Sequence, residues 1–395
     1  MEHLSDWSKA AEAGRDELIA LRRAIHAEPE LGLDCPQTRS KLEQALAGLP
    51  LKIRLSANCS GFVAILDGAS PGRAVLLRGD MDALPIHEAT GLDFASREPG
   101  RMHACGHDSH SAMLASAARI LCARRDKLAG RILFMFQPGE EGQHGARVMI
   151  EEGLLGDPLP DAAFALHIWP TLPHGAVACR AGAMLASTDT LKARIVGKGG
   201  HAAMPHDARD PIPVAAEIVL GLQSEVSRRT PVTDPIVLSI TKISAGTTHN
   251  VLPDAVELLG TLRTLSPEGR ARGREAFGRI CTHVAAAHGC TAEVEIEPGY
   301  PPTINDARAV ALIRDIAGED FVELPASNMG GEDFSYVLEK VPGAMAFLGV
   351  APQGEEAAIR APLHNPAMMI DEQILPKGVA LHCAFATRFL DRGWE

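Results

Sequence analysis

The 395-residue chain lacks several features, and each absence argues against a class of protein. It contains no apolar run long enough to span a bilayer, which argues against an integral membrane protein. The first residues contain no basic segment followed by an apolar one, so we see no signal peptide and expect a cytoplasmic protein. We also find no internal repeat and no low-complexity tract.

Basic residues are scarce relative to acidic ones. The chain has 38 Lys and Arg against 50 Asp and Glu, which gives a formal net charge of −12. Because nucleic acids and anionic membranes are bound through cationic surfaces, we expect neither as a partner. The remaining composition, 46% hydrophobic and 22% charged, is ordinary for a soluble globular protein.

The eight cysteines lack the paired short spacings of a disulfide framework, and they are spread from Cys35 to Cys383. In a chain of this length such a spread indicates reduced thiols. Cys105 stands apart, because the segment 103–110 also holds three histidines, His107 among them. A short Cys/His-rich tract indicates a metal site, since thiolate and imidazole bind first-row divalent metals.

Other potential ligands follow further along the chain. Glu140 and Glu141 are adjacent, and because neighbouring side chains diverge, one can bind a metal while the other acts as a base toward water. His167 follows an apolar run, and His364 lies in a loop bounded by prolines. Asp82 is placed to orient a ligating histidine through a hydrogen bond. The sequence therefore predicts a metal-dependent hydrolytic site that folding assembles.

Strand and helix patterns place these residues on an α/β framework. Apolar runs at 74–80, 131–137 and 161–166 predict buried strands, and candidate site residues follow each of them. Residues 16–27 and 109–124 predict helices. Alternating buried strands and helices favour a sheet flanked by helices, whose ligands gather beyond the carboxyl ends of the strands.

The middle of the chain has a different pattern. Strands are predicted at 190–196, 236–243, 255–262 and 291–296, with helices that begin near Pro211 and Pro267. This β-α-β-β-α-β order is that of a ferredoxin-like α+β domain. Because none of the ligand clusters described above lies within it, we expect an inserted domain at 185–295. The catalytic domain then consists of 1–184 and 296–395.

Nine motifs, in order along nearly the whole chain, resemble those of the dinuclear metal amidohydrolases and peptidases that include aminoacylase and carboxypeptidase G. The resemblance is closest to the branch of hippurate hydrolases, N-acyl-L-amino-acid amidohydrolases and auxin-conjugate hydrolases. Ser109, Gly139 and Ile168 depart from the pattern of this branch, but none of them replaces a ligand or the base. The motifs span residues 26–32, 78–85, 102–108, 136–142, 199–206, 250–253, 260–263, 329–334 and 363–366.

The resemblance implies two divalent metal ions per subunit, Mn²⁺ or Zn²⁺ first, with Co²⁺ or Ni²⁺ also compatible. It implies that Glu140 is the general base, that Asp82 supports the ligands, and that His201 stabilises the oxyanion, from its own subunit or from a neighbouring one. The implied metal ligands are Cys105, His107, Glu141, His167 and His364. The implied substrate-binding residues are Asn250, Arg263, Gly330 and Gly331.

The expected reaction is hydrolysis of the amide bond of N-acyl-L-amino acids, hippurate-like or N-acetylated, to a carboxylic acid and a free amino acid. The resemblance also implies that the inserted domain is a lid and joins subunits into a dimer or tetramer. Alternatives of the same chemistry are a dipeptidase or carboxypeptidase and an acyl-diaminopimelate deacylase. Two further alternatives are a thiol enzyme with Cys105 as nucleophile and a non-catalytic metal-binding homologue.

Overall fold

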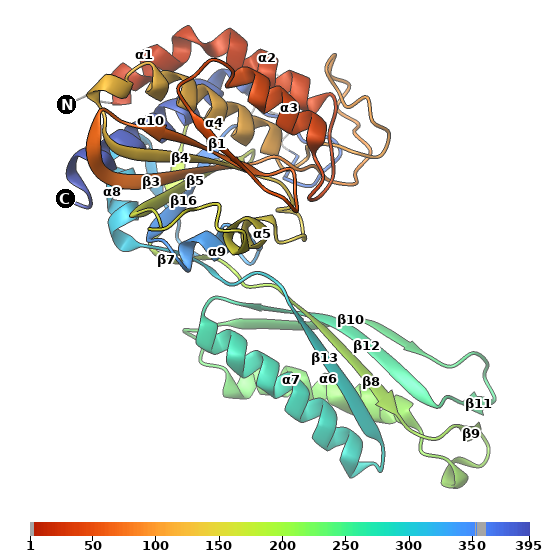
Figure 1. The fold of residues 1–395 in the computed structure, drawn as a ribbon. Helices are drawn as coiled ribbons and strands as arrows, with labels where there is room; N and C mark the ends of the chain where they lie inside the picture. The colour runs from red at the N-terminus through yellow and green to blue at the C-terminus, as the bar shows by residue number, and fades with distance from the viewer. Residues whose placement is uncertain (1–3, 352, 354–360) are drawn as a thin grey trace. The chain divides into compact units, whose positions relative to one another are not determined.

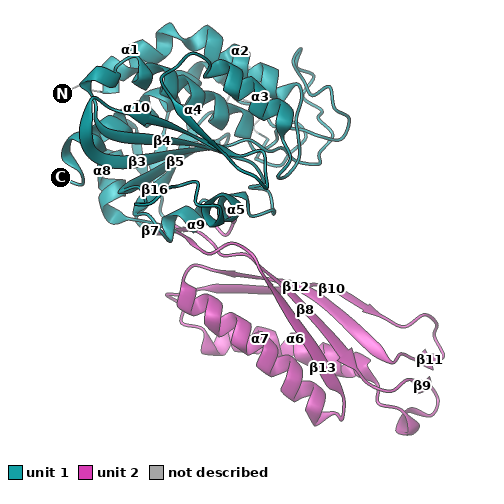
Figure 2. Cartoon of the chain, in the orientation of Figure 1, with its two compact units in different colours: residues 1–182, 304–325, 333–395 teal, residues 183–303, 326–332 magenta. Residues whose placement is uncertain are grey.

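The chain divides into two compact units (Figure 2). The computed structural model describes residues 4–351, 353 and 361–395. Unit 1 comprises Met1–Gly182, Ile304–Pro325 and Asp333–Glu395, and unit 2 comprises Ala183–Thr303 and Ala326–Glu332. The chain crosses between the two units in the short strands β7 (Gly182–Leu185) and β14 (Thr303–Asn305), and again on either side of Ala326–Glu332.

Unit 1 is built on an eight-stranded mixed sheet with the order β1-β2-β4-β3-β5-β16-β6-β15. The neighbouring strands β4, β3, β5 and β16 run parallel, and all three predicted strands are among them. The carboxyl-terminal part of β3 and almost all of β5 are buried, as expected for parallel strands covered on both faces. The strands are β1 (Lys52–Leu55), β2 (Phe62–Asp67), β3 (Ser70–Asp80), β4 (Ala129–Gln137), β5 (Ala162–Trp169), β6 (Val177–Cys179), β15 (Phe321–Glu323) and β16 (Gly343–Gly349).

Helices cover this sheet, which confirms the predicted fold class. The helices α4 and α10 pack directly on β3, β4 and β5, with α1 and α2 outside them, while α5 and α9 lie on the other side of the sheet (Figure 1). The helices of unit 1 are α1 (Leu4–Ala13), α2 (Arg15–His26), α3 (Pro36–Ala45), α4 (His107–Cys122), α5 (Gly145–Glu151), α8 (Ala307–Ala317), α9 (Ser335–Leu338) and α10 (Leu375–Arg392).

Unit 2 has the predicted β-α-β-β-α-β order, with an antiparallel sheet β10-β12-β8-β13 and both helices packed against it. The helices begin where the sequence predicts, because the side chains of Asp210 and Ser266 cap them before a first-turn proline. Its elements are β8 (Asp189–Val196), β9 (Gly200–His201), α6 (Pro211–Arg229), β10 (Ile236–Ala245), β11 (Val251–Leu252), β12 (Ala255–Thr264), α7 (Pro267–Ala287) and β13 (Thr291–Pro298).

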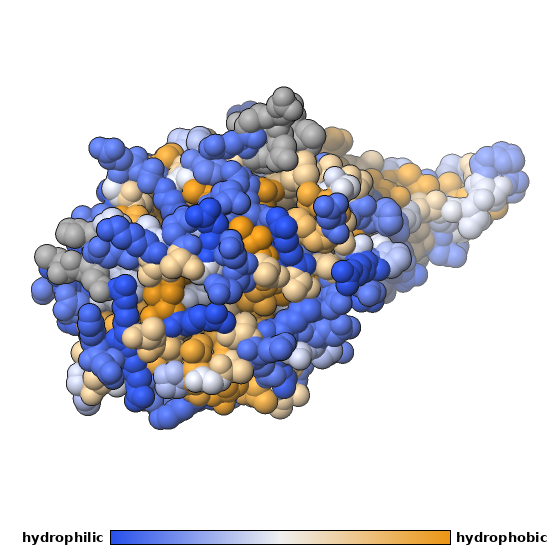
Figure 3. Space-filling view, turned by 90° about the horizontal axis from the view of Figure 1, so that it is seen from above, coloured by the Kyte–Doolittle hydropathy of each residue, from blue (hydrophilic) through white to orange (hydrophobic). Residues whose placement is uncertain are grey.

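Hydrophilic side chains separate small hydrophobic patches on the face seen from above (Figure 3). Across the described part of the chain, no helix combines the length and the apolar character needed to cross a membrane.

Candidate metal centre

The turn before α4 places Cys105 and His107 next to each other in the interior of unit 1. Gly106 between them has φ +87°, a left-handed conformation that favours glycine. A Cβ atom on Gly106 would lie 2.3 Å from Cγ1 of Ile168, so any larger residue would force Ile168 to move. The glycine therefore lets the chain turn sharply into α4 with both potential ligands buried.

Glu140 and Glu141 follow β4, and Asp82 holds them through the backbone. The N–H of Glu140 donates to Oδ1 of Asp82 over 3.0 Å, and the N–H of Glu141 donates to Oδ2 over 3.1 Å. Asp82 itself lies just beyond β3, which runs parallel to β4. Because the carboxyl ends of parallel strands meet at one edge of a sheet, the two acidic segments adjoin there.

His167 lies inside a strand, and this corrects the expectation that it follows the strand's end. β5 continues to Trp169, because its last residues pair with β16, where His167 lies opposite Phe347. His364 comes from a distant segment and has φ +62°. Its backbone N–H donates to the carbonyl of Ala104 over 2.8 Å, which brings it beside the turn that carries Cys105.

Folding brings together all five predicted ligands, and they form two sets that share one thiol. The potential ligand atoms of Cys105, His107 and His167 lie within 4.8 Å of one another, and Cys105 Sγ is 3.4 Å from Nε2 of His167. The potential ligand atoms of Cys105, Glu141 and His364 lie equally close, and Nε2 of His364 is 3.1 Å from Oε1 of Glu141. The two sets of donor atoms would suit two divalent ions.

Glu140 borders the same cluster. Its Oε2 atom lies 4.0 Å from Nε2 of His107, and the two residues form a further close set with Glu141. The predicted base thus lies at the edge of the ligand cluster and belongs to neither of the two sets that share Cys105.

Unsatisfied buried nitrogen atoms indicate that a cation belongs in this cluster. His107 is completely buried, and neither ring nitrogen makes a hydrogen bond among the described residues, although carboxylate oxygens of Asp82 and Asp80 face them at 3.4 and 3.5 Å. A buried polar atom without a partner costs free energy, which a bound metal would offset. Thiolate, imidazole and carboxylate together are the donors that first-row divalent metals prefer, so the residues fit such ions.

The electrostatics of the cluster couple metal binding to proton release. Burial raises the pKa of the Cys105 thiol, although the neighbouring His107 works against this effect. Contacts with Cys105 and Glu141 raise the pKa of His364 to about 10. Metals bind the thiolate and the neutral imidazole, so an ion bound here would displace protons from both groups.

Asp80 and His110 also lie against the cluster, and the sequence alone predicted no role for them. Asp80 Oδ1 is 2.6 Å from Nδ1 of His110, and its Oδ2 accepts a hydrogen bond from Arg78 over 2.6 Å. Burial acts to raise the pKa of Asp80, but Arg78, His107 and His110 hold it well below its usual range. The sequence signal that could have identified His110 is its spacing, because it lies one helical turn beyond His107 and therefore on the same face of α4.

Asp108, within the Cys/His-rich segment 103–110, serves a different contact. Its Oδ2 atom accepts a hydrogen bond from Nε of Arg22 over 2.7 Å and lies 2.7 Å from Nδ1 of His26. Both partners lie on α2, and all three residues are buried. Asp108 therefore ties α2 to the first turn of α4 and does not join the ligand sets.

His201 and Asn250 lie together in unit 2, on the ribbon formed by β9 and β11. His201 is exposed and lies opposite Val251, and the backbone carbonyl of Asn250 accepts the N–H of Ala202 over 3.1 Å. Nδ1 of His201 accepts the N–H of Ala203 over 3.0 Å. A neutral His201 therefore carries its proton on Nε2, where it can be donated.

Arg263 and Gly331 lie at the opposite end of the unit 2 sheet. Nη1 of Arg263 is 3.5 Å from the point where a Cβ on Gly331 would lie, and the neighbouring Gly330 donates its N–H to the side chain of Asn328. Since a strand rises about 3.4 Å per residue, the stretch of β12 from Ala255 to Arg263 spans about 27 Å. Of the four predicted substrate-binding residues, Arg263, Gly330 and Gly331 thus lie together, whereas Asn250 lies beside His201 near the other end of β12.

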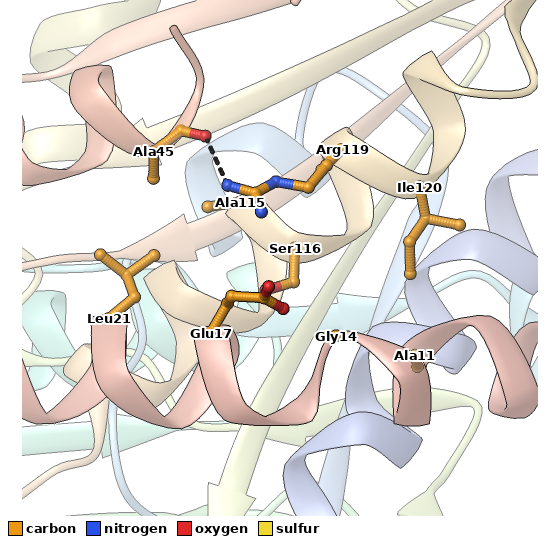
Figure 4. Close-up of a pocket in the computed structure, with 9 residues that line it drawn as sticks. All are labelled: Ala11, Gly14, Glu17, Leu21, Ala45, Ala115, Ser116, Arg119 and Ile120. Atoms are coloured by element: carbon orange, nitrogen blue, oxygen red, sulfur yellow. Dashed lines mark hydrogen bonds between the residues drawn. The ribbon is translucent and has the colours of Figure 1, made fainter.

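A small cavity elsewhere in unit 1 lacks the chemistry of the metal centre. It has a volume of about 130 Å³ and lies among the helices α1 to α4 (Figure 4). Glu17 and Ser116 point toward each other across it, and Arg119 donates to the carbonyl of Ala45 over 3.3 Å. None of the predicted site residues lines this cavity.

Comparison with known protein families gives one match that spans most of the chain. Residues 76–388 match the model described as peptidase family M20/M25/M40. The matched region includes every predicted ligand as well as Glu140 and His201.

Two curated relatives and one solved structure match over nearly their full length. The chain is 39% identical to N-acetyl-L-cysteine deacetylase of Bacillus subtilis, over 96% of this chain and 89% of that protein. It is 38% identical to IAA-amino acid hydrolase ILR1-like 2 of Arabidopsis thaliana, over 98% and 88%. The structure of the Bacillus subtilis YXEP protein, described as a dinuclear metal binding peptidase from the M20 family, aligns with a TM-score of 0.83, at 34% identity, over 96% and 99%.

Proposed function

This chain belongs to peptidase family M20/M25/M40, and from that membership we propose that it hydrolyses the amide bond of N-acyl-L-amino acids. The products are a carboxylic acid and a free amino acid. Two relatives support this substrate class, because one is named as a deacetylase of an N-acetyl amino acid and the other as a hydrolase of an amino acid conjugate. The observation that carries the proposal is the pair of ligand sets joined by Cys105.

The five clustered side chains would hold two divalent ions, with Mn²⁺ or Zn²⁺ favoured and Co²⁺ or Ni²⁺ compatible. The structure described as dinuclear and metal binding supports the number of ions. When bound, such ions lower the pKa of a water molecule and polarise the substrate carbonyl. The ligands are Cys105, His107, Glu141, His167 and His364.

Glu140 moves the proton in this reaction. Asp82 holds the backbone N–H of Glu140, and the carboxylate borders His107 at the edge of the ligand cluster. We assign Oε2 of Glu140 to accept the proton of the attacking water and to deliver it to the leaving amine. His201 donates from Nε2 to the oxyanion of the tetrahedral intermediate, because its Nδ1 already accepts a backbone N–H.

Arg263 is our candidate for binding the free α-carboxylate of the substrate. It is partly buried, and no hydrogen bond to its guanidinium is found within the described residues. Burial lowers the pKa of Arg263, against the influence of Asp189, so the charge is held at a cost that a bound carboxylate would offset. Gly331 lies beside the Arg263 guanidinium, where a Cβ atom would come within 2.3 Å of Thr188, and Asn250 joins His201 on the ribbon.

The distance between Arg263 and the ribbon that carries His201 and Asn250 supports a homo-oligomer, a dimer or tetramer joined through the inserted unit. The span of about 27 Å along β12 is longer than an N-acyl amino acid. If Arg263 and His201 both touch one substrate, they come from two copies of the chain. We propose this arrangement for a cytoplasmic enzyme without nucleic-acid or membrane partners.

The substitution Glu140→Gln tests the central assignment. It removes the base but not a ligand, so we expect two metal ions per chain as in the wild type and a kcat lower by about 10²–10⁴-fold. Glu151→Gln, an exposed carboxylate on α5, serves as the matched control and should retain full activity. Unchanged turnover in Glu140→Gln would show that Glu140 is not the base.

Chelation separates this proposal from a thiol enzyme with Cys105 as its nucleophile. Removal of the metals should abolish hydrolysis, and restoring Mn²⁺, Zn²⁺, Co²⁺ or Ni²⁺ one at a time should identify the ions that support it. Preserved turnover in metal-free protein would refute the dinuclear mechanism.

Mixing two inactive variants tests whether His201 acts across a subunit interface. In a mixed dimer of His201→Ala and Glu140→Ala, one site receives both intact residues if they come from different chains. Random pairing in equal amounts should then restore about a quarter of wild-type activity. No recovery after subunit exchange, verified by differently tagged chains, would place His201 in the site of its own subunit.

A substrate panel resolves the acyl group and the alternatives within the family. N-acetyl, N-benzoyl and indole-acyl amino acids are assayed beside dipeptides and an N-acyl-diamino acid. We expect the highest kcat/KM within the first group. A preference for dipeptides or the diamino acid would replace the proposed substrate class without changing the chemistry.

A further inference from the structure

His110 is a buried histidine on α4 whose two ring nitrogens bind different strands. Its Nδ1 lies 2.6 Å from Oδ1 of Asp80, at the end of β3. Its Nε2 accepts the backbone N–H of Ile168, in β5, over 2.9 Å. The side chain is 1% exposed, so water does not compete for either contact.

These two partners allow only one protonation state of the imidazole. A backbone N–H can only donate, so Nε2 of His110 must present a lone pair to Ile168. The Asp80 carboxylate is also bound by Arg78 and can only accept, so Nδ1 of His110 carries the proton. His110 is therefore a neutral linker between a carboxylate and a backbone amide.

The position of Ile168 in the sheet explains why its N–H needs this partner. The ladder between β3 and β5 ends where Arg78 lies opposite Ala165. Beyond this point β5 continues only along β16, with Ile168 opposite Leu348. His110 supplies the acceptor on the side where β3 no longer pairs with β5.

The same residue, Ile168, orients a metal ligand through its carbonyl. Nδ1 of His167 lies 2.6 Å from the carbonyl oxygen of Ile168, and a carbonyl can only accept a hydrogen bond. The proton of a neutral His167 is thus on Nδ1. Its Nε2 presents a lone pair toward Cys105 Sγ, 3.4 Å away.

We propose that His110 is a positioning residue of the metal centre, which fixes the tautomer and orientation of His167 by anchoring the backbone of Ile168. His110 does not bind the ion itself, because both of its nitrogens are already engaged. Partners behind a ligating histidine set its tautomer and basicity. The proposal concerns metal binding alone, so a titration with metal tests it without any substrate and separately from the proposed reaction.

Three substitutions at His110 separate its two contacts. His110→Gln keeps an acceptor that can reach the N–H of Ile168, His110→Asn keeps only a donor toward Asp80, and His110→Phe keeps the ring but neither contact. Metal-free protein is titrated with Zn²⁺ by calorimetry. We expect His110→Phe and His110→Asn to weaken one of the two binding steps by about 10–100-fold, and His110→Gln to stay within a few-fold of wild type.

The variant His167→Ala identifies which binding step belongs to His167. Adding His110→Phe to His167→Ala should then cause no further loss, because both substitutions act on the same ligand. His382→Phe is the matched control, since it removes another buried imidazole of unit 1 whose ring nitrogens have no partner among the described residues. It should leave both binding steps unchanged.

Three results would overturn the proposal. The first is a His110→Phe protein that binds both ions within twofold of wild type, and the second is a full additional loss in the double variant. The third needs no substitution: ¹⁵N NMR of the metal-free wild type should show His167 protonated at Nδ1 and His110 at Nδ1. Protonation of either ring at Nε2 instead would contradict the hydrogen bonds on which the assignment rests.

Discussion

The backbone N–H groups of Glu140 and Glu141 share one acceptor, the carboxylate of Asp82. Both oxygens of Asp82 are used, and Nδ1 of His107 lies 3.4 Å from Oδ1 of the same group. A single side chain behind the site thus positions the predicted base and two of the predicted ligands. This contact pattern supports the role that the sequence resemblance implied for Asp82.

Asp82→Asn should therefore disturb metal binding without removing a ligand. The amide keeps the shape of the side chain but offers one acceptor oxygen where two backbone N–H groups need one each. We expect metal affinity to fall by about 10–100-fold, measured by competition with a chromophoric chelator. Asp93→Asn, on the exposed surface, is the control. Equal affinity in the two variants would show that the Asp82 contacts are dispensable.

Arg263→Met should lower kcat/KM for substrates with a free carboxylate but not for their neutral amides. Loss of the guanidinium removes the proposed partner of the substrate α-carboxylate, so kcat/KM for an N-acyl amino acid should fall by about 10²-fold. The matching N-acyl amino acid amide carries no charge there and should be cleaved at a nearly unchanged rate. Equal losses for both substrates would assign Arg263 a structural role instead.

At the scale of elements, the start of α4 depends on Gly106. The residue combines φ +87° with a close approach to Ile168, so both backbone and packing require glycine there. Gly100 has φ +78° but nothing within 4 Å of its Cβ position. Comparing substitutions at the two glycines therefore distinguishes the cost of the left-handed backbone from the cost of a steric clash.

Gly106→Ala should therefore destabilise the protein more than Gly100→Ala. We expect a loss of about 1–2 kcal/mol from the left-handed backbone in both variants. Gly106→Ala should lose a further ~1–3 kcal/mol, because the methyl group meets Ile168. Urea denaturation of metal-free protein measures both free energies of unfolding. Equal losses would mean that Ile168 moves aside without cost.

Local and nonlocal elements differed in how well they could be predicted. The starts of α6 and α7 were predictable, because Asp210 and Ser266 cap their own helices within a few residues. The end of β5 was not, because pairing with β16, far away in the sequence, extends it through His167 to Trp169. The ferredoxin-like order of unit 2 followed from alternating local patterns and is confirmed.

At the scale of the whole molecule, a buried histidine links the stability of the fold to pH. His382 on α10 is fully buried, and its ring lies 5.3 Å from that of Phe164. Burial lowers the pKa of His382 to about 3, with His110 adding to the effect. In the unfolded chain histidine titrates near its usual value of about 6.5. The unfolded chain therefore takes up this proton first as the pH falls.

His382→Phe should reduce this sensitivity to acid. The contribution of His382 is fully present above pH ~6.5 and is lost as the pH falls toward the folded pKa near 3. The unfolding free energy of the wild type should decline relative to the variant by up to about 1.4 kcal/mol per pH unit in this window. Chemical denaturation between pH 4 and 8 measures the difference. A difference that does not change with pH would contradict the linkage.

The sequence by itself determined which chemistry this protein carries. Thiolate, imidazole and carboxylate groups are intrinsically able to bind metals or accept protons, so Cys105, His107, Glu140 and Glu141 could be singled out from residue type and spacing. The alternation of strands and helices is also a local property, and it predicted an α/β unit with a ferredoxin-like insertion.

Only the tertiary structure decided which of these groups lie together as ligands and which residues hold them in place. That Cys105 belongs to two ligand sets follows from strands and turns that meet across the fold. The link from Asp80 through His110 and Ile168 to His167 joins residues from three elements, and no sequence spacing encodes it. Hydrogen-bond partners that lie far apart along the chain depend on how the chain packs, which residue type alone does not specify.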